Sequence, residues 1–248
     1  MIVAFESIDI PTSGPPVRTL LARPKGTEGT RLPTVVIWSD IFQLTAPHLR
    51  VLSRFASHGF LVVAPEIYAR VEPAGTVLDF ERDRARALDD ASKVELAWID
   101  EERRAVLDAL RARSDVGAIG ACGFCFGGHL AFRAALEPEV QATACFYATG
   151  VHDGNLGAAK GTAGTLERAA EIRGELLLVW GANDPHIPAA GRAKIHRALE
   201  DASVRYETRL FDAEHAFARD EGPRWDPEAS DRAIAAALEL FRRKLHCR

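Results

Sequence analysis

The sequence predicts an α/β protein with a mostly parallel sheet, and three observations support this prediction. Short apolar runs that suit buried strands alternate along the chain with longer segments of helical spacing. No linker, internal repeat or low-complexity tract divides these segments. With 248 residues, of which 47% are hydrophobic and 27% charged, the chain can bury one large core, so we expect a single domain over residues 1–248.

The chain is expected to begin with a hairpin and to continue with alternating strands and helices. Strands at residues 3–10 and 17–22 flank Pro11-Thr-Ser-Gly-Pro-Pro16, a turn-forming stretch that suits an antiparallel pair. The later strands are short and apolar, as buried parallel strands are, and are expected at residues 34–38, 60–64, 118–123, 142–147, 176–180 and 204–211. Helices are expected at residues 47–58, 80–113 (with Asp90 as a candidate break), 130–136, 189–201 and 227–245.

Composition and charge argue against several classes of protein. The first residues lack a basic region followed by a long apolar stretch, and no apolar run approaches the roughly 18 residues of a membrane span. The formal net charge is −4 with both signs interspersed, so no nucleic-acid surface is expected. The four cysteines do not form the pattern of a disulfide framework, which favours a cytoplasmic location: Cys122, Cys125, Cys145 and Cys247.

One stretch, Ala118-Ile-Gly-Ala-Cys-Gly-Phe-Cys-Phe-Gly-Gly-His129, combines a strand, a sharp turn and the start of a helix. Glycines two residues before and two residues after Cys125 suit a turn in which strand and helix almost touch, because a Cβ there would clash. This is the pattern of a nucleophile elbow, usually G-x-S-x-G, with cysteine in the serine position. The backbone N–H of Phe126 is then placed at a helix start, where it can donate to a developing oxyanion.

Two other interpretations of this stretch are open. Cys125 also fits a buried thiol at an ordinary strand-to-helix turn, since free cysteine is among the most buried residue types. Cys122 and Cys125 form a C-x-x-C pair, but the sequence has no second pair and no nearby histidine at zinc-finger spacing. We therefore expect no metal site, and acyl transfer through a thiolate requires no cofactor.

Two further residues are expected at the same edge of the sheet, because reactive groups in parallel sheets collect beyond the carboxyl ends of the strands. Asp184 follows the strand at 176–180, and His215 follows the strand at 204–211. The chain order nucleophile, acid, histidine is that of α/β-hydrolases, in which the histidine takes the nucleophile's proton and the acid fixes its tautomer. Taken alone, Asp184 also fits a turn and His215 a loop histidine, but the three together favour a triad.

Two neighbouring features are left without a catalytic role. His129 lies one turn beyond Cys125 on the expected helix, where packing is the favoured role. Residues 151–171 are rich in glycine and alanine and are longer than a helical crossover needs. This segment fits either a surface crossover or a mobile loop beside the site.

These residues, with several short motifs, resemble the dienelactone hydrolase family over about residues 33–241. The motifs are Asp40-Ile-Phe42, Tyr68-Ala-Arg70 with the Pro- and Gly-containing loop after it, Gly123-Phe-Cys-Phe-Gly-Gly128, Asn183-Asp184 and His215-Ala-Phe-Ala-Arg219. Together they are more specific than an elbow alone. The resemblance implies an α/β-hydrolase fold, with a mostly parallel central sheet flanked by helices and an N-terminal antiparallel hairpin.

The resemblance also implies a reaction, the hydrolysis of a small carboxylated lactone such as dienelactone to maleylacetate. A thiol ester would form on Cys125, with His215 as base and then acid and Asp184 orienting the imidazole. The family's oxyanion hole uses the N–H after the nucleophile and one from the loop after the third strand. These groups map to Phe126 and Ile41.

Substrate recognition is implied by the same resemblance. Two arginines that hold the substrate carboxylate map to Arg70 and Arg219, and a planar guanidinium suits a carboxylate because it can bond both oxygens. Each arginine also fits a surface ion pair. Asp40 stands where the family usually has a glutamate that interacts with the resting thiol and helps to generate the thiolate. Aspartate is one methylene shorter, so contact with Cys125 is either lost or requires a closer loop. Asp40 is therefore a thiol-activating group, a residue that tunes a different substrate, or a structural residue.

Two other functions stay open on the sequence. One is a carboxylesterase or thioesterase of the same fold, and the other is a non-catalytic protein that binds a small acid. A pure binder has no need of the complete set Cys125, Asp184 and His215, which argues against the last. The expected partner is a small-molecule lactone or ester, without nucleic acid or membrane, and the chain is expected to be a monomer or weak homo-oligomer.

Overall fold

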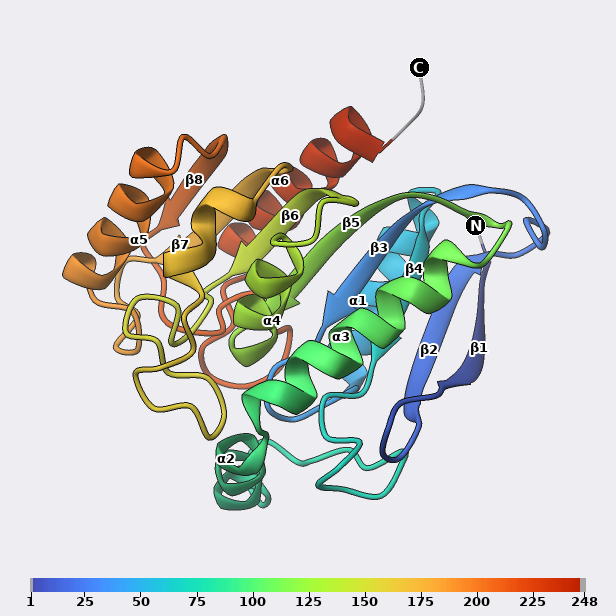
Figure 1. The fold of residues 1–248 in the computed structure, drawn as a ribbon, viewed down its shortest axis with the longest axis horizontal. Helices are drawn as coiled ribbons and strands as arrows, with labels where there is room; N and C mark the ends of the chain where they lie inside the picture. Colours follow the sequence, from blue (N-terminus) through green and yellow to red (C-terminus); the bar gives the residue numbers. More distant parts are fainter. Residues whose placement is uncertain (1, 246–248) are drawn as a thin grey trace.

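An eight-stranded sheet in the order β1-β2-β4-β3-β5-β6-β7-β8 runs through the computed structural model, which describes residues 2–245 (Figure 1). The strands are β1 (Val3–Ile10), β2 (Val17–Pro24), β3 (Leu32–Trp38), β4 (Leu61–Pro65), β5 (Val116–Phe124), β6 (Val140–Phe146), β7 (Glu175–Gly181) and β8 (Tyr206–Phe211). β2 pairs antiparallel with both β1 and β4, whereas all pairs from β4 to β8 are parallel. The predicted mostly parallel sheet with an N-terminal antiparallel hairpin is confirmed.

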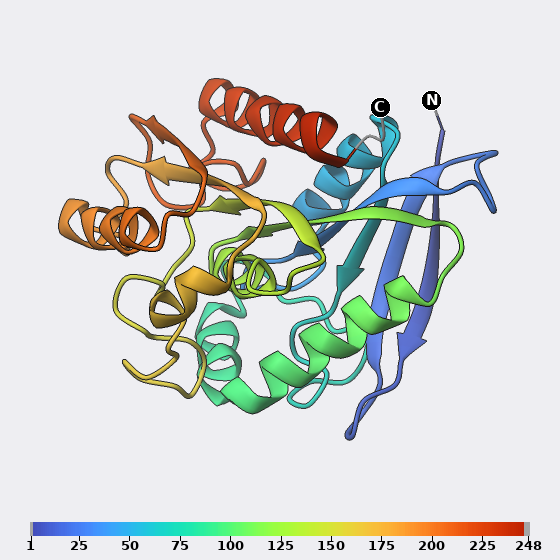
Figure 2. The ribbon, with the colours of Figure 1, turned by 45° about the horizontal axis from the view of Figure 1, so that its top comes forward.

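Helices cover both faces of this sheet. They are α1 (Ala46–Ser57), α2 (Arg84–Lys93), α3 (Leu96–Arg111), α4 (Phe126–Ala134), α5 (Ala189–Asp201) and α6 (Pro227–Leu245), with a short 3-10 helix η1 (Leu166–Glu171). Figure 2 shows α1 and α6 on one side of the sheet and α3 and α4 on the other. In the sheet, β4 lies on one side of β3, and β5 to β8 follow on the other side. Because crossovers between parallel strands are right-handed, connections in these two directions place their helices on opposite faces.

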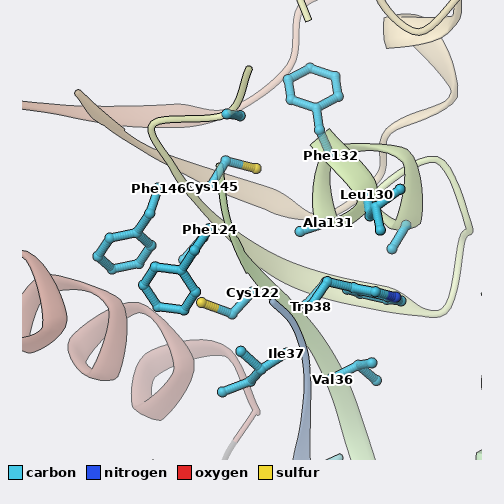
Figure 3. Close-up of a cluster of buried hydrophobic side chains, with 14 of the residues drawn as sticks. Val36, Ile37, Trp38, Cys122, Phe124, Leu130, Ala131, Phe132, Cys145 and Phe146 are labelled. Carbon is cyan, nitrogen blue, oxygen red and sulfur yellow. The ribbon is translucent and has the colours of Figure 1, made fainter. Parts of the chain in front are cut away.

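The central strands are apolar on both faces because helices bury both sides. Figure 3 shows Ile37, Cys122 and Phe124 on the side that faces α6, whereas Trp38 lies on the side of α4 together with Leu130. All five residues of β4 and all seven of β7 are buried. The edge strand β8 is only partly buried, unlike the buried strand expected over residues 204–211, because it has a neighbouring strand on one side only.

The predicted helix over residues 80–113 is two helices, and the break lies four residues beyond Asp90. Val94 has extended backbone angles, φ −66° and ψ 117°. Its carbonyl oxygen leaves the helical pattern and accepts a hydrogen bond from the Ala158 N–H at 2.9 Å. A Cβ on Gly157 would lie 2.0 Å from the same oxygen. The break therefore depends on a contact with a distant loop, which local periodicity does not encode.

Smaller differences occur at element ends. The last strand begins at Tyr206 rather than residue 204, because the Val204 N–H donates to Leu199 at the end of α5. Within residues 2–245, no helix is both long enough and apolar enough to cross a bilayer. Cys247 lies outside the described residues.

Candidate active site

Cys125 occupies the sharp turn between β5 and α4. Its φ of 57° and ψ of −117° are unusual for a residue with a side chain. A Cβ on Gly123 would lie 1.9 Å from the Gly127 oxygen, and a Cβ on Gly127 would lie 2.2 Å from the Ser39 oxygen. Both contacts are with backbone, so both glycines are required where β5, α4 and the loop after β3 meet.

Three backbone hydrogen bonds hold the strained cysteine. The Cys125 N–H donates to the Phe146 oxygen at 3.0 Å, and its carbonyl oxygen accepts from Gly128 at 3.0 Å and from Thr149 at 3.2 Å. Backbone strain of this kind costs about 1–3 kcal/mol and persists only where the surroundings fix it. The Cys125 side chain is partly exposed, whereas Cys122 and Cys145 are buried. Cys125 is thus the accessible thiol among these three.

A buried histidine and aspartate form a hydrogen-bonded pair at the same edge of the sheet. His215 lies four residues past β8 and Asp184 three residues past β7, and each is 5% exposed. His215 Nδ1 lies 2.7 Å from Asp184 Oδ2. The other oxygen, Asp184 Oδ1, accepts the His186 N–H at 2.8 Å. Because a carboxylate only accepts, Nδ1 carries a proton and Nε2 is left for a reacting group.

The charges around His215 favour its protonated form. Burial alone would lower its pKa, but the charge of Cys125, a hydrogen bond with the Cys125 side chain and the Asp184 carboxylate together raise the pKa to about 10. Burial acts to raise the pKa of Asp184, and His215 outweighs it, leaving that pKa below its ordinary value. An imidazolium beside a thiol stabilises the thiolate, which is the nucleophilic form. The site is therefore suited to a thiolate–imidazolium pair.

Two backbone N–H groups can form an oxyanion hole. Phe126 is the first residue of α4, where an N–H has no partner within the helix. Ile41 lies in the loop after β3, and its N–H has no acceptor among residues 2–245. The Tyr68 hydroxyl donates to the Ile41 carbonyl oxygen at 3.0 Å, which holds the next peptide of this loop, between Ile41 and Phe42. Tyr68, known from the sequence only as part of a motif, thus supports this loop.

Asp40 and Arg219 lie together, a pairing that the sequence does not predict. Arg219 Nη1 is 3.5 Å from Asp40 Oδ2, and Asp40 Oδ1 accepts the Phe42 N–H at 3.0 Å. The guanidinium carbon also lies 3.9 Å from the centre of the Phe80 ring. Burial raises the pKa of Asp40, while Arg219 and the Phe42 N–H oppose that rise. No hydrogen bond between Asp40 and Cys125 occurs in the described part of the chain.

Arg70 is engaged elsewhere. Its Nη2 donates to Glu101 Oε2 at 2.7 Å and its Nε to Glu102 Oε1 at 3.1 Å, both on α3, and it also reaches Ser13. Its guanidinium lies 5.6 Å from the Trp98 ring centre. The structure therefore brings Arg219, but not Arg70, into contact with the other predicted site residues.

A hollow beside Asp40 and Arg219 contains residues that the sequence analysis did not assign. It has about 310 Å³ of space outside atoms and is also lined by His48, Phe124 and Tyr147. Tyr147 packs edge-on against the His215 ring at 5.1 Å between ring centres. His48 Nε2 is buried and has no hydrogen-bond partner among the described residues. Only the fold brings His48 and Tyr147 to this place, so no sequence pattern marks them.

The described residues contain no group of three or more histidine, cysteine, aspartate or glutamate side chains placed to hold a metal ion.

The sheet order, with a sharp turn after β5 and a histidine after β8, is that of the α/β-hydrolases. A putative dienelactone hydrolase from Klebsiella pneumoniae has a TM-score of 0.85 and 25% identity, covering 98% of this chain and 99% of its own. A dienelactone hydrolase-like promiscuous phosphotriesterase from metagenomic libraries, at 20% identity, shares the fold with a TM-score of 0.78. The class of the protein is thus a carboxylic ester hydrolase of the α/β-hydrolase fold.

Sequence comparison defines the family. The model of the dienelactone hydrolase family matches residues 17–245. A putative carboxymethylenebutenolidase of Saccharomyces cerevisiae is 33% identical over 99% of this chain and 93% of its own length. A carboxymethylenebutenolidase of Pseudomonas sp. (strain P51) is 30% identical over 86% of this chain and 85% of its own. The chain belongs to the dienelactone hydrolase family, as its motifs predict.

Proposed function

We propose that this protein hydrolyses a small carboxylated lactone of the dienelactone type through a thiol ester on Cys125. The observation that carries the proposal is the buried Asp184–His215 pair beside a partly exposed cysteine in a strained turn. The similarity to carboxymethylenebutenolidases supports a lactone as the substrate.

The proposed reaction has two steps of acyl transfer. The Cys125 thiolate attacks the lactone carbonyl, and the N–H groups of Ile41 and Phe126 stabilise the resulting oxyanion. The ring oxygen leaves with the proton of His215, which opens the ring and leaves the acyl group on sulfur. The now neutral imidazole takes a proton from water as that water attacks the thiol ester, which restores the imidazolium. The C–S bond then breaks, which releases the ring-opened acid and leaves the Cys125 thiolate beside the imidazolium.

The raised pKa of His215 gives this imidazole the role of acid in the first step. The charge of Cys125 contributes to the pKa of about 10, so in the resting ion pair the imidazole already holds the proton that the thiol has lost. In this scheme Asp40 is not required as the proton acceptor. A substrate carboxylate that pairs with Arg219 would compete with Asp40 and displace it from the guanidinium.

We assign the substrate carboxylate to Arg219, which lines the hollow beside Asp40. Arg70 would take part only after leaving Glu101 and Glu102, with which it is paired. This pairing favours a second candidate function, the hydrolysis of a neutral ester or thioester, because both arginines already have carboxylate partners. We also propose a cytoplasmic location, which suits the free thiols of Cys122, Cys125 and Cys145.

Enzyme assays on a substrate panel test both candidates. Dienelactone, its methyl ester, p-nitrophenyl esters and a thioester are compared for the wild type, Cys125→Ala and Cys122→Ala. We expect Cys125→Ala to abolish turnover and Cys122→Ala, which removes a buried thiol three residues away, to retain it. A preference for the methyl ester over the free acid would favour the second candidate, and equal turnover by Cys125→Ala and wild type would overturn both.

A further inference from the structure

His129 lies one turn beyond Cys125 on α4 and is completely buried, with 0% of its surface exposed. Its Nδ1 lies 3.0 Å from the Thr149 carbonyl oxygen, and its Nε2 lies 2.8 Å from Thr165 Oγ1. Both ring nitrogens therefore have partners from the segment between β6 and β7. The reaction proposed above makes no use of this histidine.

The partners of His129 determine where its proton lies. A carbonyl oxygen only accepts, so Nδ1 carries the hydrogen that bonds to Thr149. Arg133 Nη1 donates to Thr165 Oγ1 at 2.9 Å, which leaves the hydroxyl hydrogen of Thr165 available to bond Nε2. Burial, aided by the charge of Arg133, lowers the pKa of His129 to about 3, so the ring is neutral. The hydrogen bonds thus run in one direction, from Arg133 through Thr165 and His129 to Thr149.

The outer end of this chain of hydrogen bonds is fixed. Arg133 donates from Nε and Nη2 to the two oxygens of Asp100 on α3, at 2.9 and 2.6 Å. It also donates to the Ala163 oxygen at 2.8 Å. A bidentate pair of this kind combines charge with a defined geometry. Residues 148–165 are therefore tied to α3 and α4 at several points rather than lying free on the surface.

The inner end reaches the nucleophile. The peptide N–H of Thr149 donates to the Cys125 carbonyl oxygen at 3.2 Å, while the Thr149 carbonyl oxygen accepts from His129. Cys125 needs such contacts because its φ is positive. Displacing Thr149 would remove one of the hydrogen bonds that hold this turn.

We propose that His129 is a positioning residue for the nucleophile, acting through Thr149 on the Cys125 turn without touching the reacting atoms. The inference rests on the proposed role of Cys125. Small displacements of reacting groups reduce rates strongly, by about 100-fold for 1 Å, so the expected effect falls on kcat rather than on substrate binding.

The tautomer of His129 is measured in the wild-type protein, and the variant His129→Asn serves only to assign the signal. Nitrogen-15 NMR of histidine-labelled protein reports which ring nitrogen carries hydrogen. Burial lowers the pKa of His48 as well, to about 4, so two buried histidines should stay neutral between pH 5 and pH 9. We expect the signal that is lost in His129→Asn to show hydrogen on Nδ1. Hydrogen on Nε2, or titration of this ring within that range, would overturn the inference.

Two substitutions separate positioning from packing. In His129→Asn the amide nitrogen replaces Nδ1 and keeps the donor to Thr149, whereas in His129→Gln the amide oxygen replaces Nε2 and keeps the acceptor for Thr165. Each variant keeps one of two hydrogen bonds, so a packing role predicts equal losses. We expect kcat to fall about 10- to 100-fold in His129→Gln and about threefold or less in His129→Asn, with KM unchanged.

Equal kcat in the two variants, or a larger loss in His129→Asn, would overturn the inference. The result is distinguishable from failure of the proposed function. If Cys125→Ala retains full turnover, the proposed function fails. If Cys125→Ala is inactive while His129→Gln has wild-type kcat, only the role of His129 fails.

Discussion

Replacing Asp184 by asparagine tests the electrostatic basis of the site with almost no change of shape. Asp184 Oδ2 bonds His215 Nδ1, and Oδ1 accepts the His186 N–H. An amide has only one oxygen, so in one of these two contacts the amide nitrogen, which is a donor, faces another donor. If the oxygen stays with His186, the amide nitrogen faces Nδ1, and the imidazole must place its hydrogen on Nε2 instead.

The size of the effect follows from the lost charge. A hydrogen bond to a charged group contributes about 1.5–3 kcal/mol, and one pKa unit corresponds to about 1.36 kcal/mol, so the pKa of His215 should fall by about 1–2 units. The wild-type pKa is raised from 6.5 to about 10, so the stability that it contributes is fully present below pH 6.5 and is lost as the pH rises through about 10. In Asp184→Asn this loss should occur at lower pH.

The assay is a pH profile of kcat/KM for ester or lactone hydrolysis, with urea unfolding at the same pH values. We expect the basic limb of the wild type near pH 10 and that of the variant about 1–2 units lower. The altered tautomer should also reduce kcat by about 100- to 10,000-fold. A basic limb that does not move, together with wild-type kcat, would refute the assigned role of Asp184.

Three further predictions concern the turn, the arginines and a buried glutamate. In Gly123→Ala the new Cβ would lie 1.9 Å from the Gly127 oxygen, so we expect the free energy of unfolding to fall by about 2 kcal/mol or more, and unchanged urea unfolding with unchanged kcat would contradict this. Arg219→Met should raise KM for a carboxylated lactone about 10- to 100-fold while leaving its methyl ester little affected, and equal changes for both substrates would argue against carboxylate recognition. Burial, opposed by Arg70, raises the pKa of Glu102 from 4.5 to about 7, so stability is lost as the pH rises through about 7. Between pH 4.5 and pH 8, the free energy of unfolding of Glu102→Gln in urea should therefore rise by up to about 3 kcal/mol relative to that of the wild type. A difference between the two proteins that does not change with pH would contradict this.

Much of the fold follows from local pattern. The apolar runs of β3, β4 and β7 are recognisable because both faces of each strand are buried. The turn at Cys125 is recognisable because only glycine tolerates the close approach of β5 and α4. Chain order then predicts that Asp184 and His215 meet beyond the strand ends, and in the structure these two residues are hydrogen-bonded.

Long-range pairing limits what the sequence predicts. The motif that contains Arg70 does not reveal that Glu101 and Glu102 on α3 hold its side chain. Similarly, the shorter side chain of Asp40 bonds its own loop and Arg219, a choice that depends on the loop after β8. His129 has helical spacing typical of packing, and only the contacts with Thr149 and Thr165 distinguish it from a core residue.

The most direct test of the central claim is mass spectrometry of the enzyme quenched in acid during turnover. Peptide mapping should find the substrate acyl group on the peptide that contains Cys125, at a level that decays as substrate is exhausted. The same experiment on Cys125→Ala should find no adduct and no turnover. Turnover without any adduct on this peptide, or an adduct on another residue, would contradict the account.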